Sequence, residues 1–99
     1  MRLWVDDVRP APDGWEWCKT SAEAILFLKN WYVDIISLDH DLGGNDTGYK
    51  VLVYIEYQVA IEGESAPMIE IHTANPVARE RMQATVTSIN AFDRQNKAG

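Results

Sequence analysis

The sequence predicts a small α/β domain in which helices cover a parallel β-sheet on both faces. Short apolar runs typical of buried strands alternate along the chain with segments whose apolar residues recur at helical spacing. The 99 residues are 46% hydrophobic, which is enough apolar material for one packed core. Repeats, linkers and low-complexity segments are absent, and the one cysteine allows no internal disulfide. We therefore expect a single domain over residues 1–99.

Four segments have the composition and the boundaries of strands. They are short and apolar or aromatic, loop signals flank them, and they span residues 3–5, 15–19, 35–38 and 68–71. Two prolines and a glycine make residues 8–14 a loop. This loop is shorter than the dozen residues that a parallel crossover normally needs. The direction of the second strand is therefore left open.

Three helices are predicted from their start signals and apolar spacing. Thr20 and Glu23 fit a capping box, Thr47 is a plausible cap for a second helix ending at Gly63, and Asn75-Pro76 opens the third. The third helix should bury one stripe of side chains, namely Ala78, Met82, Val86, Ile89 and Phe92. Polar residues dominate after Arg94, so we expect residues 95–99 to be frayed.

Charge and hydropathy exclude several classes of function. The net charge of -6 repels nucleic-acid backbones and anionic lipid surfaces, so bulk nucleic-acid or membrane binding is not expected. No apolar run approaches the roughly 20 residues that cross a bilayer, and no apolar leader opens the chain. A single cysteine, Cys18, fits a reducing compartment. We expect a cytoplasmic protein, and its oligomeric state is left open.

Polar residues gather where the apolar strands end. In parallel sheets, ligands bind beyond the carboxyl ends of the strands. Asp6 and Asp7 follow the first strand, and Asp39 follows the third. Three neighbouring carboxylates repel unless a cation neutralises them, and hard oxygen ligands select Mg²⁺, Mn²⁺ or Ca²⁺ over zinc, of which we expect Mg²⁺ or Mn²⁺. We predict a divalent-cation site there, with Asp41 as a further candidate ligand; the alternative is that these residues merely cap loops.

Both histidines of the chain follow predicted strands on the same edge. A free histidine side chain has a pKa near 6.5, which suits acid and base catalysis at neutral pH. We therefore take His40 and His72 as candidate catalysts, although either residue could instead be structural. The start of the third helix could hold a phosphate. The candidate phosphate-binding residues are Arg9, Thr73, Asn75 and Arg79.

Three motifs, at residues 4–10 (WVDDVRP), 37–43 (SLDHDLG) and 71–76 (IHTANP), resemble a divergent branch of the response-regulator receivers. This branch is the cyclic-phosphate-processing receiver-like family, common in bacteria and their phages. The resemblance implies a three-layer α/β sandwich with a trimmed flavodoxin-like sheet of four strands, in the order 2-1-3-4, and three helices. A receiver's helix between its first two strands, and its fifth strand with a phosphoryl-contacting lysine, have no counterpart here. Phosphorelay is therefore not expected.

The resemblance and the strand-end residues together predict a metal-assisted phosphoesterase that opens a cyclic phosphate on a nucleotide or an RNA end. Asp6, Asp7 and Asp39 would hold the cation, and His72 and His40 would act as acid and base. The rival is a non-catalytic module that sequesters a nucleotide signal or docks on a partner protein. A third hypothesis is a degenerate phosphoacceptor receiver with Asp39 as the acceptor.

Overall fold

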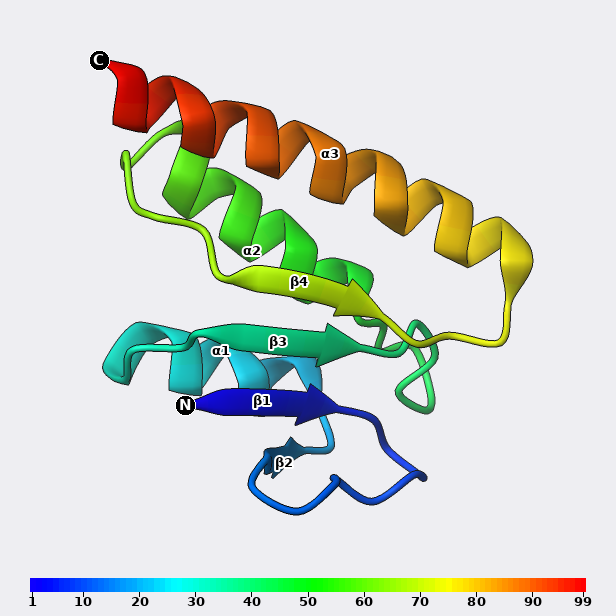
Figure 1. The fold of residues 1–99 in the computed structure, drawn as a ribbon. Helices are drawn as coiled ribbons and strands as arrows, with labels where there is room; N and C mark the ends of the chain where they lie inside the picture. The colour runs from blue at the N-terminus through cyan, green and yellow to red at the C-terminus, as the bar shows by residue number, and fades with distance from the viewer.

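The computed structural model describes residues 1–99 and contains one four-stranded parallel sheet with three helices (Figure 1). The strand order is β2-β1-β3-β4, so the predicted order 2-1-3-4 is confirmed. The elements along the chain are β1 (Arg2–Val5), β2 (Glu16–Cys18), α1 (Ser21–Asn30), β3 (Ile35–Leu38), α2 (Tyr49–Ala60), β4 (Met68–Ile71) and α3 (Pro76–Ala98).

The second strand is parallel to the first, which settles the question that the short connection left open. Trp4 pairs with Trp17, and Val5 pairs with Cys18. The chain returns beside β1 as a loop without a helix. Trp15 packs edge-on against Trp4 with ring centroids 6.1 Å apart, and the Trp4 indole N–H donates to the carbonyl of Arg9 at 2.9 Å. Aromatic packing therefore takes the place of the crossover helix.

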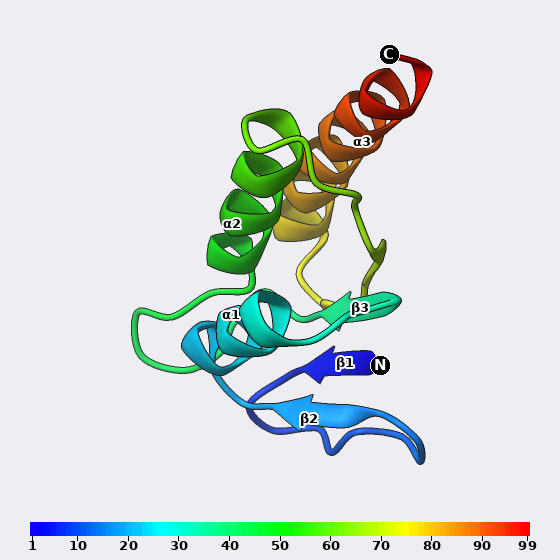
Figure 2. The ribbon, with the colours of Figure 1, turned by 90° about the vertical axis from the view of Figure 1, so that its left-hand side faces the viewer.

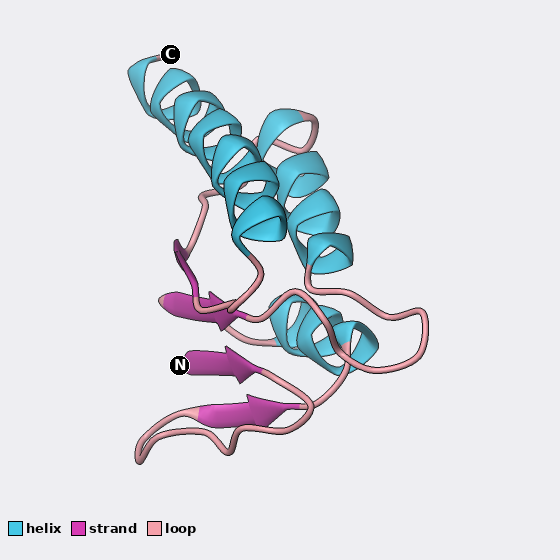
Figure 3. Cartoon of the chain, turned by 90° about the vertical axis from the view of Figure 1, so that its right-hand side faces the viewer, coloured by secondary structure: helices cyan, strands magenta, loops and turns pink.

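The helices leave one face of the sheet without a helical layer. Figures 2 and 3 show α1 and α2 on the same side of the strands, with α3 packed on α2 beside β4. Leu3, Val5, Ile36 and Leu38 point to this side and are completely buried. On the other face, Glu70 is exposed and Trp4 only half-buried. The prediction that helices cover both faces is thus wrong, because the helix that a receiver has between its first two strands is a loop in this chain, as its sequence indicated, and the three remaining helices lie on one side.

Two of the three predicted helix starts are confirmed. Thr20 accepts a hydrogen bond from the backbone N–H of Glu23, and Asn75 caps α3. The prediction for Thr47 is wrong, since α2 begins after Gly48 and has no side-chain cap. Thr47 instead forms an isolated antiparallel bridge with Asp41. Glycine is required at 48 because a Cβ there would lie 1.9 Å from the carbonyl oxygen of Asp39.

The third helix continues beyond the predicted end of ordered structure. The expected fraying of residues 95–99 is wrong, because α3 runs to Ala98. The side-chain amide of Asn96 donates to the carbonyl of Val59 at 2.8 Å, and Lys97 pairs with Asp93 at 2.9 Å. The first contact ties the last turns to α2, and the second stabilises them within α3. Four of the five stripe residues are buried, while Phe92 is 37% exposed.

Cys18 is completely buried in β2, and burial raises the pKa of its thiol to about 12. The residue therefore contributes packing and no thiolate chemistry at neutral pH. None of the three helices combines the length with the apolar composition that a bilayer crossing requires.

Candidate functional site

The structure brings the three predicted metal-binding carboxylates together at the carboxyl ends of β1 and β3. Asp6, Asp7 and Asp39 each offer one oxygen, and these oxygens lie within 4.8 Å of one another. The approach is close because β1 and β3 are neighbours and Val5 pairs with Leu38. Asp6 is completely buried, whereas Asp7 and Asp39 are half-buried. An all-carboxylate donor set with this spacing fits a hard divalent cation.

Asp6 is the most heavily hydrogen-bonded carboxylate of the site. Its Oδ1 accepts from the backbone N–H groups of Val8 and Arg9, at 2.9 and 2.8 Å. Its Oδ2 lies 3.1 Å from Nε2 of His72 and 3.0 Å from Nε of Arg9. Burial alone would raise the pKa of Asp6, but these hydrogen bonds and the charge of Arg9 hold it below its ordinary value of 3.8. Asp6 is therefore a carboxylate at neutral pH.

His72 is held on three sides, and its neighbours define its protonation. Its Nδ1 lies 2.7 Å from Oγ of Ser37, and its ring stacks on Trp4. Burial lowers the pKa of His72 below 6.5, although Asp6 opposes the shift. A neutral imidazole has one N–H, and ionised Asp6 can only accept a hydrogen bond. Nε2–H therefore donates to Asp6, and the Ser37 hydroxyl donates to Nδ1.

His40 differs from His72 in having an unengaged ring. Its backbone N–H donates to Oδ1 of Asp39 at 2.7 Å, and its carbonyl accepts from Gly48. The imidazole itself makes no hydrogen bond and is half-buried. The side chain of His40 is therefore free to contact a ligand.

Asp41 does not join the three-carboxylate cluster. Its Oδ1 accepts from the backbone N–H of Gly43 at 3.0 Å, and its side chain is exposed. This hydrogen bond and the β-bridge to Thr47 give Asp41 a structural role in the loop between β3 and α2.

Arg9 connects the separate parts of the site. Its Nε is 3.0 Å from Oδ2 of Asp6, and its Nη2 is 3.6 Å from Oδ2 of Asp39. The same Nη2 donates to the carbonyl of His72 at 3.0 Å. Arg9 thus carries the positive charge that the cluster has in this structure, and its side chain is 52% exposed.

Three of the four predicted phosphate-binding residues, Thr73, Asn75 and Arg79, form a network among themselves. Oδ1 of Asn75 accepts from the N–H groups of Val77 and Ala78, both at 3.1 Å. Oγ1 of Thr73 accepts from the N–H of Asn75, and Nη2 of Arg79 donates to the carbonyl of Thr73. The first free amides of α3, which we expected to be open to a phosphate, are therefore occupied by the cap.

Two residues of the site escaped the sequence analysis. Ser37 and Trp4 both contact His72, yet each lies inside a strand rather than at its end. A signal existed for Ser37, because it is the one polar residue of a buried apolar run. Trp4 alternates with the core residues Leu3 and Val5, so its ring had to lie on the opposite face.

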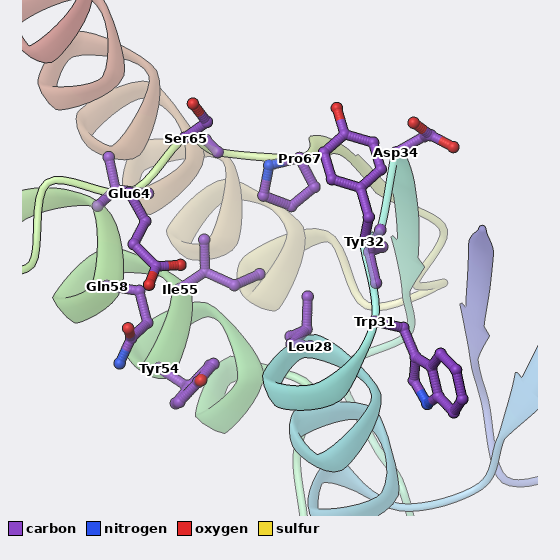
Figure 4. Close-up of a pocket in the computed structure, with 13 residues that line it drawn as sticks. Leu28, Trp31, Tyr32, Asp34, Tyr54, Ile55, Gln58, Glu64, Ser65 and Pro67 are labelled. Carbon is purple, nitrogen blue, oxygen red and sulfur yellow. The ribbon is translucent and has the colours of Figure 1, made fainter.

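A separate cavity of about 140 Å³ lies between α1, α2 and the segments that precede β3 and β4 (Figure 4). Leu28, Tyr54 and Ile55 are among its lining residues. It lies beyond the amino ends of these strands and includes none of the predicted site residues. The carboxylates and histidines at the opposite edge therefore remain the candidate site.

The comparisons with known proteins agree with this geometry. A family model described as the cyclic-phosphate processing receiver domain matches residues 1–88. The chain belongs to this family. The match includes every predicted site residue from Asp6 to Arg79.

A solved structure supports the fold of the cyclic-phosphate processing receiver domain seen here. It is described as a yeast Spc42 trimeric coiled-coil segment fused to another protein, and it is 19% identical with a TM-score of 0.61. The alignment covers 98% of this chain and 78% of that chain. At this identity the likeness concerns the fold alone. A search of curated proteins finds no match.

Proposed function

We propose that this receiver domain is a metal-assisted phosphoesterase that opens a cyclic phosphate on a nucleotide or an RNA end. The observation that carries the proposal is the convergence of three carboxylates within 4.8 Å, in a chain of a family named for cyclic-phosphate processing. Such a cluster is costly to build unless a cation compensates the repulsion among its charges.

Asp6, Asp7 and Asp39 are the residues that would hold Mg²⁺ or Mn²⁺. Such an ion supplies Lewis acidity toward phosphoryl oxygens and makes a bound water more acidic. Asp6 is held rigidly by the hydrogen bonds from Val8, Arg9 and His72, so its position is set before any ligand arrives. This preorganisation favours a defined coordination geometry.

The two histidines take different parts in the proposed reaction. The ring of His40 is unengaged and is suited to exchange a proton with substrate directly, as a general acid or base. His72 uses both ring nitrogens on Ser37 and Asp6, so it acts as an acid or base only if one of these bonds opens. In its resting arrangement it positions Asp6.

Arg9 and Arg79 are the cationic side chains proposed to bind the phosphate. Arg79 is anchored through the carbonyl of Thr73, which aims its guanidinium at the edge where Asn75 begins α3. A guanidinium recognises phosphate through paired N–H donors. Thr73 and Asn75 would support this contact as part of the same network.

The test is a panel of cyclic nucleotides and cyclic-phosphate-ended RNAs, incubated with the protein and Mg²⁺ or Mn²⁺. Formation of a linear phosphate that depends on the metal and on Asp39 supports the proposal. Recovery of every ligand intact after denaturation, with measurable binding, favours the non-catalytic binder. The matched variants are Asp39→Asn and the exposed loop variant Asp13→Asn, which should behave like the parent.

A further inference from the structure

The guanidinium of Arg9 lies among the carboxylates of the proposed metal site. It is 3.0 Å from Asp6 and 3.6 Å from Asp39, measured from Nε and Nη2 to the respective Oδ2 atoms. Three carboxylates and one guanidinium leave an excess of negative charge, so the site still attracts a cation. Arg9 already occupies part of the space from which a cation would contact Asp6 and Asp39.

Asp6 has no lone pair left for a metal while Arg9 is in place. A carboxylate offers about four acceptor positions on its two oxygens. Val8 and Arg9 fill two of them through their backbone N–H groups, and His72 and the Arg9 side chain fill the others. One of these four donors must withdraw before Asp6 can coordinate an ion.

Among these donors, the Arg9 side chain is the least restrained. The two backbone N–H groups belong to the loop that follows β1 and cannot leave without refolding it. His72 is fixed by its stacking on Trp4 and by Ser37. Apart from its two ion pairs, the side chain of Arg9 makes one hydrogen bond, from Nη2 to the carbonyl of His72, and this bond is solvent-exposed. The side chain is 52% exposed and can rotate into solvent while its backbone N–H stays bonded to Asp6.

We propose that Arg9 holds the place of the divalent cation in the metal-free protein and withdraws when the cation binds. Its guanidinium, still tethered beside the site through the backbone, then becomes available to a phosphate. Metal binding and phosphate binding are thereby coupled, with the metal entering first. This inference rests on the proposed metal-assisted function and assigns Arg9 two successive partners.

Calorimetric titration of Mn²⁺ into the parent protein and Arg9→Gln tests the first half of the inference. Loss of the competing ion pairs that Arg9 makes with Asp6 and Asp39 should tighten the Mn²⁺ dissociation constant about 5-fold in Arg9→Gln, which corresponds to about 1 kcal/mol. Arg94→Gln removes the same charge from an exposed position on α3 and should match the parent. Arg9→Lys keeps the positive charge and serves as a second variant if Arg9→Gln folds poorly. Its affinity for Mn²⁺ should lie between those of the parent and Arg9→Gln.

A second titration, with inorganic phosphate at saturating Mn²⁺, tests the coupling. Arg9→Gln should bind phosphate several-fold more weakly than the parent, and Arg94→Gln should not differ from it. Equal or weaker Mn²⁺ binding by Arg9→Gln would overturn the displacement, and unchanged phosphate affinity would overturn the coupling. If neither parent nor Arg9→Gln binds Mn²⁺, the metal-assisted function falls together with this inference. These titrations measure binding and not turnover. A panel that shows no catalytic activity would therefore count against the phosphoesterase function without deciding whether the cation displaces Arg9.

Discussion

The imidazole of His72 lies flat against the indole of Trp4, with ring centroids 3.9 Å apart and ring planes only 5° apart. Trp4 lies in β1 and His72 directly follows β4, so the stack spans β3, which separates these strands in the sheet. Ser37, from that intervening strand, meets the same ring at Nδ1. Three strands thus orient one histidine toward Asp6. This arrangement explains why the helix-free face of the sheet still carries buried polar groups.

Replacing Ser37 by alanine should destabilise the protein and loosen His72. The change removes the hydroxyl that donates to Nδ1 and leaves a buried acceptor unsatisfied, which typically costs about 1–3 kcal/mol. Urea denaturation measures the loss. The exposed helical variant Ser88→Ala should change the free energy of unfolding by less than about 0.5 kcal/mol. Equal effects of the two variants would mean that the Ser37–His72 hydrogen bond contributes nothing measurable.

Stability should fall as the pH drops below about 6.5. Burial lowers the pKa of His72 in the folded state below the ordinary 6.5. Between that lowered value and 6.5 the unfolded chain binds a proton that the folded protein does not, so acid favours unfolding. The lowered pKa of Asp6 adds a second loss of stability as the pH falls below 3.8. Unfolding titrations between pH 5 and 8 measure the first effect.

The matched comparison for this pH dependence uses both histidines. His72→Gln should flatten the stability profile near pH 6, because the titrating group has been removed. His40→Gln should retain the slope of the parent, because the ring of His40 has no buried partner. An unchanged slope in His72→Gln would show that another group causes the acid sensitivity.

Mn²⁺ at 100 times its dissociation constant should raise the melting temperature of the parent by roughly 10–20 °C. A ligand at 100 times its dissociation constant adds about 2.7 kcal/mol to the free energy of unfolding, and a domain of this size gains about 4–8 °C per kcal/mol. Asp39→Asn should lose most of the shift, since it removes one of the three charged ligands. Asp13→Asn is the control and should melt like the parent with the ion. A full shift in Asp39→Asn would place the ion elsewhere.

Gly48→Ala should be more damaging than a substitution at a glycine with a left-handed backbone. The backbone of Gly48 is helical, with φ of -63°, so alanine is strained only by its Cβ, which would lie 1.9 Å from the carbonyl oxygen of Asp39. No side-chain rotation relieves a contact with the main chain, and overpacking of this kind costs about 1–3 kcal/mol or more.

The control for Gly48→Ala is Gly44→Ala, where φ is 56° but nothing lies within 4 Å of the added methyl group. That change should cost only the left-handed conformational penalty, about 1–2 kcal/mol. Gly48→Ala should in addition weaken Mn²⁺ binding, because it pushes on the backbone of Asp39. If both variants keep the stability and metal affinity of the parent, the close approach of α2 to Asp39 has no energetic importance.

The parts of the site that follow strand ends could be predicted from the sequence, and the parts inside strands could not. Asp6, Asp39 and His72 each come directly after an apolar run, and parallel pairing carries such positions to one edge. The contacts of Ser37 and Trp4 with His72 depend on the register among three strands, which no local pattern encodes. Arg9 was predicted as a phosphate ligand, but its position between two carboxylates depends on the course of an irregular loop.

The fold shows the same division between local and long-range information. The caps at Thr20 and Asn75 were predictable because a helix start depends on a few neighbouring residues. The predicted cap at Thr47 was wrong for a long-range reason. The backbone of Asp39 lies so close to position 48 that only glycine fits there, and α2 begins after this glycine. The absence of a helical layer on one face of the sheet also depends on long-range contacts. Trp4 and Trp15 pack together where a receiver has a crossover helix, and the spacing of these residues in the sequence does not predict that contact.

Because Cys18 is completely buried, the reactivity of its thiol reports how often the edge of the sheet opens. The thiol lies in β2, and the carbonyl of the same residue accepts a hydrogen bond from the N–H of Asp6 at 3.0 Å. A thiol-specific reagent can reach the sulfur only in molecules whose edge strand has separated from β1 or which have unfolded. Since the chain has one cysteine, the rate of its labelling gives the free energy of that opening without any introduced probe. Comparing labelling rates with and without a divalent cation would show whether occupation of the carboxylates is transmitted across β1 to the edge of the sheet.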